Sequence, residues 1–132
     1  MNDDFQKKII RFQMMEANLK ALQERAGMLS ERVQEIESTK NSIEDLKNVK
    51  PSSALIPIGS STFVHGRIES SDEVIVGIGG GIAIKKKRED AVATLECALK
   101  EMEKNLDEVK VQITNLAFEM EKLQEELERL QK

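Results

Sequence analysis

Residues 91–132 read AVATLECALKEMEKNLDEVKVQITNLAFEMEKLQEELERLQK, and this stretch decides the fold. Apolar residues recur in it at alternating steps of three and four, without a polar interruption. They are Val92, Leu95, Leu99, Met102, Leu106, Val109, Ile113, Leu116, Met120, Leu123, Leu127 and Leu130. A heptad stripe this narrow is typical of a helix that packs against another helix, because a globular helix would show a wider apolar face. The pattern therefore predicts a coiled coil.

A second stripe with the same alternation lies in the first fifty residues. It consists of Leu19, Leu22, Ala26, Leu29, Val33, Ile36 and Ile43, with Lys40 as its one polar member. Phe5, Ile9, Phe12 and Met15 continue it upstream, where an additional step of three predicts a stammer that overwinds the supercoil. Neither arm contains proline, so residues 1–50 and 89–132 are each expected to form one continuous helix. An antiparallel hairpin of helices is the simplest closure.

The composition narrows the class of protein. Charged residues make up 33% of the chain and aromatic residues 3%, which favours long helices over a compact core and suggests oligomerisation. The net charge is −4, and the absence of a basic face argues against a nucleic-acid partner. Cys97 is the only cysteine, so an internal disulfide and a paired-cysteine metal motif are excluded. We expect a cytoplasmic protein with no membrane span, metal or cofactor.

Residues 51–88 abandon the heptad and change to strand and turn chemistry. Short strands are expected at 54–58, 62–69, 74–78 and 82–84, separated by turns at the Gly and Ser clusters. Two β-hairpins of this size leave unpaired edges and an apolar face that two narrow helices cannot cover. We therefore expect them to join sheets from several subunits. The residues expected at this interface are Ile56, Ile58, Phe63, Ile68, Val74, Val76, Ile78, Ile82 and Ile84.

The middle segment also resembles a known family. Its most characteristic stretches are LIPIGS at 55–60, FVHG at 63–66 and VIVGIGGGIAIKK at 74–86, between two long heptad arms. In this layout the chain is similar to prefoldin subunits. Two hairpins match the archaeal alpha class, whereas the beta class has one; a related eukaryotic-type subunit stays open.

The resemblance implies a fold that is predominantly α with a small β component. It implies one prefoldin-like domain over residues 1–132, in which two β-hairpins join a long antiparallel two-helix coiled coil and the sheets close into an oligomeric β-barrel. It further implies a hexamer of two alpha and four beta subunits. Such hexamers bind non-native client proteins at the coiled-coil tips without ATP and deliver them to a group II chaperonin.

The sequence gives an independent reason to expect binding at the tips. In an antiparallel pair, residues 1–16 lie beside residues 121–132, and this end is more apolar than a two-stranded seam requires. Ile10 and Met14 fall outside the stripe, four residues apart on a common face. The expected client-binding residues are Phe5, Ile9, Ile10, Phe12, Met14, Met15, Leu123, Leu127 and Leu130. The alternative is that these side chains only close the coiled coil.

Other motifs have simpler interpretations. The glycines at 77–81 are expected in a turn, because a P-loop would need a following Lys-Ser/Thr and a helix. The basic run Lys85–Arg88 is expected to be a solvated strand end, with contact to an acidic neighbour left open. His65 is expected on a sheet surface and Cys97 on the outward face of its helix, so we expect no enzyme. The alternative function is a structural coiled-coil scaffold or a filament-forming homo-oligomer.

Overall fold

A computed structural model describes residues 2–131 of the 132-residue chain. The elements are α1 (Asn2–Asp45), a 3₁₀ turn η1 (Leu46–Asn48), β1 (Ser52–Gly59), β2 (Thr62–Ile68), β3 (Glu73–Gly79), β4 (Ile82–Lys87) and α2 (Arg88–Gln131). The expected architecture of two long helices and two antiparallel hairpins is confirmed. The chain divides into two compact units: unit 1 lies within residues 1–33 and 100–132, and unit 2 spans residues 34–99.

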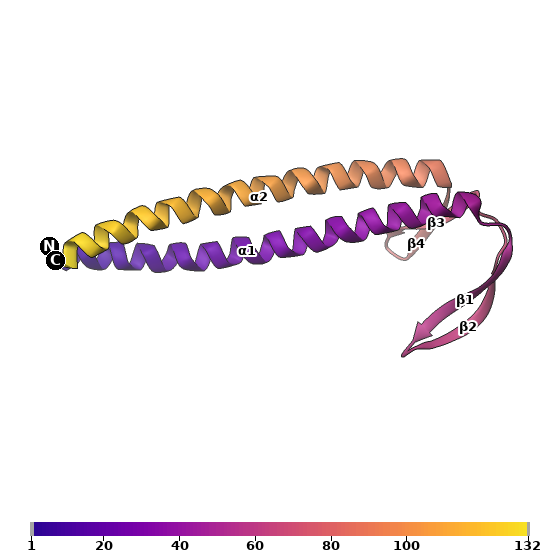
Figure 1. The fold of residues 1–132 in the computed structure, drawn as a ribbon, viewed down its shortest axis with the longest axis horizontal. Helices are drawn as coiled ribbons and strands as arrows, with labels where there is room; N and C mark the ends of the chain where they lie inside the picture. The colour runs from indigo at the N-terminus through magenta and orange to yellow at the C-terminus, as the bar shows by residue number, and fades with distance from the viewer. Residues whose placement is uncertain (1, 132) are drawn as a thin grey trace. The chain divides into compact units, whose positions relative to one another are not determined.

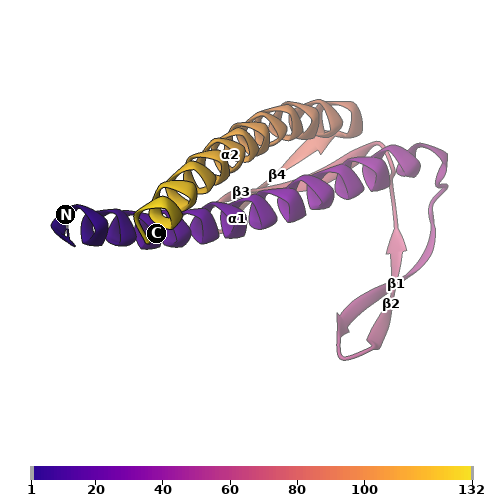
Figure 2. The same ribbon diagram turned by 60° about the vertical axis from the view of Figure 1, so that its left-hand side comes forward.

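Unit 1 is an antiparallel helix pair. Both views show the last turns of α2 beside α1 near its N-terminal end (Figures 1 and 2), where Lys8 Nζ lies 3.3 Å from Glu126 Oε2. The heptad stripes form the seam. Leu106, Val109 and Leu123 of α2 are buried. On α1, Met15 is buried and the other stripe residues in this unit are half-buried. The last member, Leu130, is 48% exposed.

Unit 2 contains the remaining part of each helix and both hairpins. Ile36 of α1 and Ala91 of α2 are buried there. Lys40, the polar member of the stripe, is only 21% exposed, and its Nζ lies 3.8 Å from Glu96 Oε1. The seam accepts this residue because the aliphatic stem of a lysine can be buried while its ammonium group reaches a carboxylate.

Helix α1 ends at Asp45, earlier than the expected boundary at residue 50. Leu46–Asn48 form a 3₁₀ turn, closed by a hydrogen bond from Val49 N to Leu46 O at 3.1 Å. Pro51 disfavours helical backbone at Lys50, so the chain leaves the helix before the proline and enters β1 extended. Helix α2 begins at Arg88 with two acidic residues, Glu89 and Asp90, in its first turn, where they complement the helix dipole.

The two hairpins are structural repeats offset by twenty residues. Leu55 pairs with His65 in the first and Ile75 with Lys85 in the second, and each hairpin shifts register just before its turn. Both turns place two residues in the left-handed region, with φ of 46° and 60° at residues 60–61 and of 62° and 77° at residues 80–81. This is the backbone of two-residue type I′ hairpins. The repeat was not predicted from the sequence, although LIPIG at 55–59 and IVGIG at 75–79 carry its signal.

Gly66 in β2 is required by packing. The side chain of Ile56 occupies the space that a Cβ at Gly66 would take. We expect Gly66→Ala to destabilise the β1–β2 hairpin by about 1–3 kcal/mol, because Ile56 must leave its position. Amide hydrogen exchange in β1 and β2 would measure this as lost protection. Gly77→Ala is the matched control, since no atom lies within 4 Å of a Cβ built there; equal losses in the two variants would refute the prediction.

Candidate functional site

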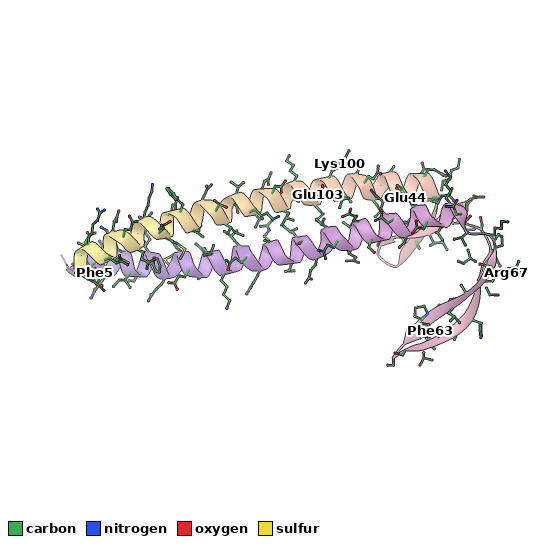
Figure 3. The ribbon with its side chains drawn as sticks, viewed as in Figure 1. Phe5, Glu44, Phe63, Arg67, Lys100 and Glu103 are labelled. Carbon is green, nitrogen blue, oxygen red and sulfur yellow. The ribbon has the colours of Figure 1, made fainter. Side chains whose placement is uncertain are left out.

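The first candidate surface is the terminal end of unit 1, defined as residues 3–16 of α1 and 119–131 of α2. Phe5, Ile9 and Phe12 are half-buried in the seam, and Figure 3 labels Phe5 at this end. Ile10 and Met14 point out of the seam and are 56% and 63% exposed. The α1 side of the terminal end therefore has an apolar seam and two apolar side chains outside it.

The remaining expected tip residues differ in burial. Met15 and Leu123 are buried between the helices, and Leu127 is half-buried. Their side chains belong to the seam in this arrangement and offer little surface to a partner. Leu130 is exposed, so three of the nine expected residues (Ile10, Met14 and Leu130) present apolar surface directly.

Charged groups surround this apolar surface. The acidic residues at the end of α2 are Glu119, Glu121, Glu125, Glu126 and Glu128. Lys8 joins the two helices, with its Nζ 3.3 Å from Glu126 Oε2 and 3.7 Å from Asp4 Oδ2. Lys122 Nζ lies 4.5 Å from the centroid of the exposed Phe118 ring. These polar groups keep the end hydrated without covering Ile10 or Met14.

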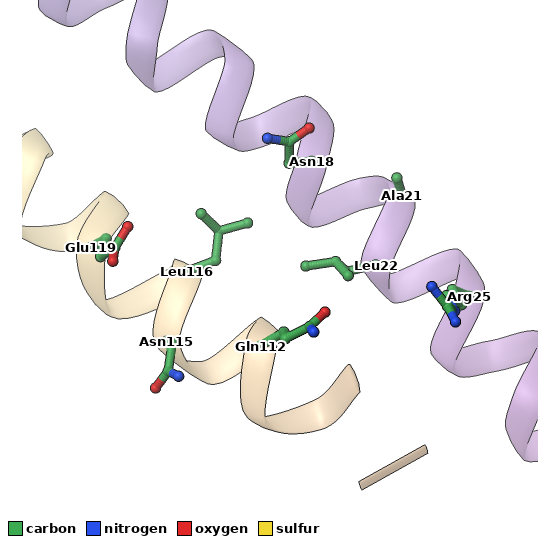
Figure 4. Close-up of a pocket in the computed structure, with 8 residues that line it drawn as sticks. All are labelled: Asn18, Ala21, Leu22, Arg25, Gln112, Asn115, Leu116 and Glu119. Carbon is green, nitrogen blue, oxygen red and sulfur yellow. The ribbon is translucent and has the colours of Figure 1, made fainter. Parts of the chain in front are cut away.

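An open groove of about 550 Å³ lies between the helices of unit 1 (Figure 4). Leu22 and Leu116 extend into it from opposite helices, beside the polar groups of Asn18, Gln112 and Glu119. The groove is thus a shallow part of the seam. Across residues 2–131 no cluster of three or more His, Cys, Asp or Glu side chains is placed to hold a metal ion. In the same range, no helix combines the length and apolarity needed to span a bilayer.

The second candidate surface is the apolar side of the hairpins. Of the residues expected at an interface, Ile56, Ile58, Phe63, Ile78, Ile82 and Ile84 are exposed, and Ile68, Val74 and Val76 are half-buried. Figure 3 labels Phe63 just after the β1–β2 turn. Leu55, Val64 and Ile75 are also exposed. Val64 pairs with Ile56 and shares its face, whereas Leu55 and Ile75 lie on the opposite faces of their strands, opposite His65 and Lys85.

The basic run at 85–88 is more than a solvated strand end. Arg88 Nη1 donates to Ser71 O at 2.7 Å, and Arg88 N donates to Asp72 O at 2.9 Å. Lys86 Nζ donates to Thr94 Oγ1 at 3.2 Å. The expectation of a solvated strand end is therefore wrong for Arg88, whose side chain is only 12% exposed, whereas Lys86 is half-buried with an exposed hydrogen bond. They tie the connection between the hairpins, and β4 itself, to α2.

Other exposed side chains lie outside both surfaces. His65 is exposed on β2, and the Cys97 thiol is exposed on α2. Met28, Val111 and Phe118 are exposed apolar residues on the outer faces of the helices, which our sequence analysis did not single out. They occupy heptad positions away from the seam, and this position was the available signal.

Two long antiparallel helices joined by two β-hairpins define a prefoldin-type subunit. The family model described as Prefoldin subunit matches residues 15–132. The chain therefore belongs to the prefoldin subunit family. Among solved structures, that of filamentous PFD from Methanocaldococcus jannaschii has the same fold, with a TM-score of 0.70 and 22% sequence identity over 93% of this chain and 97% of the other.

Curated relatives support the alpha class. Prefoldin subunit alpha of Methanobrevibacter smithii is 32% identical over 88 residues, which cover 67% of this chain and 60% of that protein. Prefoldin subunit alpha of Pyrococcus horikoshii is 25% identical over 117 residues, covering 87% of this chain and 79% of that protein. The match thus spans less than two thirds of the length of the Methanobrevibacter smithii protein and more than two thirds of the length of the Pyrococcus horikoshii protein. The resemblance to archaeal alpha subunits, expected from the hairpin segment, is confirmed.

Proposed function

We propose that the chain is a subunit of an ATP-independent holdase chaperone that binds non-native proteins at the terminal end. The observation that carries this proposal is the exposure of Ile10 and Met14 beside an apolar seam. A holdase must accept many sequences, and shallow apolar contacts suit that task better than a shaped site. The thioether of Met14 is flexible and polarizable, so it adapts to different client surfaces.

Assembly supplies the affinity that one end lacks. Two exposed apolar side chains bind weakly, but several ends that hold the same client raise the effective concentration and give avidity. The exposed apolar residues of the hairpins support a joined multi-subunit body, here proposed as two alpha and four beta subunits. In this proposal the hexamer is cytoplasmic and passes its client to a group II chaperonin. The role is binding, with no catalytic step.

The double variant Ile10→Ser/Met14→Ser tests the terminal end. We expect the assembled complex to need about tenfold higher concentration to suppress aggregation of a denatured client. A bound client would cover the side chains of Ile10 and Met14, and serine removes part of that apolar contact, at a cost of roughly 1–2 kcal/mol of binding free energy. Light scattering of a chemically denatured client measures this. Met28→Ser is the matched control, since Met28 is 72% exposed but lies outside the terminal end. Equal loss in both variants, or full protection by the double variant, would reject the assignment.

A second candidate is a filament-forming homo-oligomer. The observation that favours it is the filamentous PFD from Methanocaldococcus jannaschii, a solved structure of the same fold. The exposed hairpin faces support this alternative equally well, because they can join copies of one chain. Electron microscopy of the purified chain, alone and with a beta subunit, separates the two candidates. Long filaments from the chain alone, without protection of a client, would favour the second.

A further inference from the structure

The two hairpins of unit 2 are held in different ways. In the β3–β4 hairpin, Val74 and Val76 are half-buried and line a mostly apolar cavity of about 400 Å³ together with residues of both helices. On the matching face of the β1–β2 hairpin, Ile56 and Val64 are directly paired and both are exposed. This face of the first hairpin lies open in the described chain. The direction of the first hairpin therefore depends on the segments that join it to the rest of the unit.

The connection between β2 and β3 is fixed to the first residue of α2. Arg88 N donates to Asp72 O at 2.9 Å, one step beyond the last paired residues of the β3–β4 ladder. The guanidinium reaches further back, and Arg88 Nη1 donates to Ser71 O at 2.7 Å. The other nitrogen, Nη2, lies 3.2 Å from Glu89 Oε1. Within the connection, Asp72 N donates to Ser70 Oγ at 3.2 Å. Successive residues of the connection are thus bonded, and the largely buried side chain of Arg88 joins them to the helix.

A small rotation at this connection becomes a large displacement at the far end of the first hairpin. The eight residues of β1 span about 26 Å at roughly 3.3 Å per residue. A rotation of about 20° at the base therefore moves the turn by roughly 9 Å, which is nearly twice the ~4.8 Å spacing of paired strands. A strand displaced by that distance cannot pair with the same neighbour in the same register. The rotation between joined subunits also decides whether an assembly closes or continues as a filament.

We propose that Arg88 is the positioning residue that selects a closed assembly over an open one. By holding the connection, its guanidinium fixes the direction in which the β1–β2 hairpin leaves unit 2, and with it the rotation between joined subunits. Arginine suits this task because its planar group presents several donors at fixed angles, so that one side chain bonds to Ser71 O and Glu89 together. This inference rests on the proposed role of the hairpins in assembly and adds the residue that determines its geometry.

Arg88→Met tests the proposal in the full chain mixed with a beta subunit. Methionine retains an apolar stem and the backbone bond to Asp72, but it cannot bond to Ser71 O. We expect native mass spectrometry to show a broad series of masses, including assemblies larger than the hexamer, in place of one dominant mass. Lys87→Met is the matched control, because Lys87 is exposed, adjoins Arg88 and loses the same charge. We expect the control to give the same mass as the unmodified complex.

Hydrogen exchange and a conservative variant show whether the effect comes from positioning. Exchange of the Asp72 amide should become about tenfold faster in Arg88→Met than in Lys87→Met, whereas exchange in the β1–β2 ladder should be unchanged. Arg88→Lys retains the charge and one flexible donor, so its mass distribution should lie between those of Arg88→Met and the unmodified chain. If Arg88→Met loses protection throughout both hairpins, the masses of Arg88→Lys decide, and a single dominant mass then overturns the proposal.

Two further results would overturn the proposal: the same masses for Arg88→Met and Lys87→Met, or an unmodified chain that gives no dominant closed complex with the beta subunit. Client protection is measured separately, on the unmodified complex. Failure of that complex to protect a denatured client, together with the expected masses for Arg88→Met and Lys87→Met, would refute the proposed function alone.

Discussion

Replacing Val109 with Asp is expected to open the helix pair. Val109 is 4% exposed in the seam. A carboxylate at this position must lose its hydration without a partner, and the variant also loses an aliphatic group. We expect a destabilisation of roughly 3–5 kcal/mol. Urea unfolding followed by circular dichroism measures it, since the chain has no Trp or Tyr for fluorescence.

The matched control lies two residues further along the same helix. Val111 is 58% exposed, on the outward side of α2. Val111→Asp introduces the same side chain into the same helix and changes helix propensity equally, so it isolates the effect of burial. We expect a change within about 0.5 kcal/mol, as for ordinary surface substitutions. Similar destabilisation by both substitutions would contradict the assignment of the seam.

Replacing Ile56 with Asp is expected to abolish assembly while the subunit still folds. Ile56 is 47% exposed in the single chain, so a carboxylate there stays hydrated until another subunit covers the face. Covering it then requires burial of an unpaired charge, which costs several kcal/mol and weakens association by more than about a hundredfold. Native mass spectrometry of the chain mixed with a beta subunit measures the loss of the complex. Hydrogen exchange checks that the hairpin persists.

Leu55→Asp is the control for this prediction. Leu55 precedes Ile56 and is more exposed, at 61%, but it lies on the opposite face, opposite His65. Arg67 is on the same face as His65, so a carboxylate at Leu55 has a cationic neighbour and a hydrated setting. We expect the Leu55→Asp complex to form. A complex that is lost equally with Leu55→Asp and Ile56→Asp would show that the two faces are not distinguished in assembly.

The sequence predicted the helices well because the seam is a one-dimensional pattern. A stripe from Val92 to Leu127 leaves a helix only one side to bury, and the structure places every stripe residue except Leu130 at least half-buried. The hairpins were predicted for a similar reason, since Gly and Ser clusters limit the turns. The end of α1 at Asp45 was not predicted, because no proline or glycine marks that position.

The candidate surfaces were predicted less completely. Ile10 and Met14 could be placed outside the seam by counting heptad positions. The burial of Met15 and Leu123 depends on the opposing helix, which one stripe does not specify. The roles of Lys86 and Arg88 depended on distant partners: Arg88 bonds to a connection seventeen residues earlier in the chain. No local signal distinguishes these two residues from an ordinary basic run.

The sequence by itself determined two antiparallel helices, two tight hairpins and the apolar residues that each presents, because periodicity and turn chemistry act between near neighbours in the chain. Only the tertiary structure decided which of these residues are covered. It placed Lys40 beside Glu96, tied the hairpin connection to Arg88, and left a mostly apolar cavity between the β3–β4 hairpin and the helices of unit 2. These features depend on contacts between segments far apart in sequence, and the amino-acid pattern of neither segment specifies its partner.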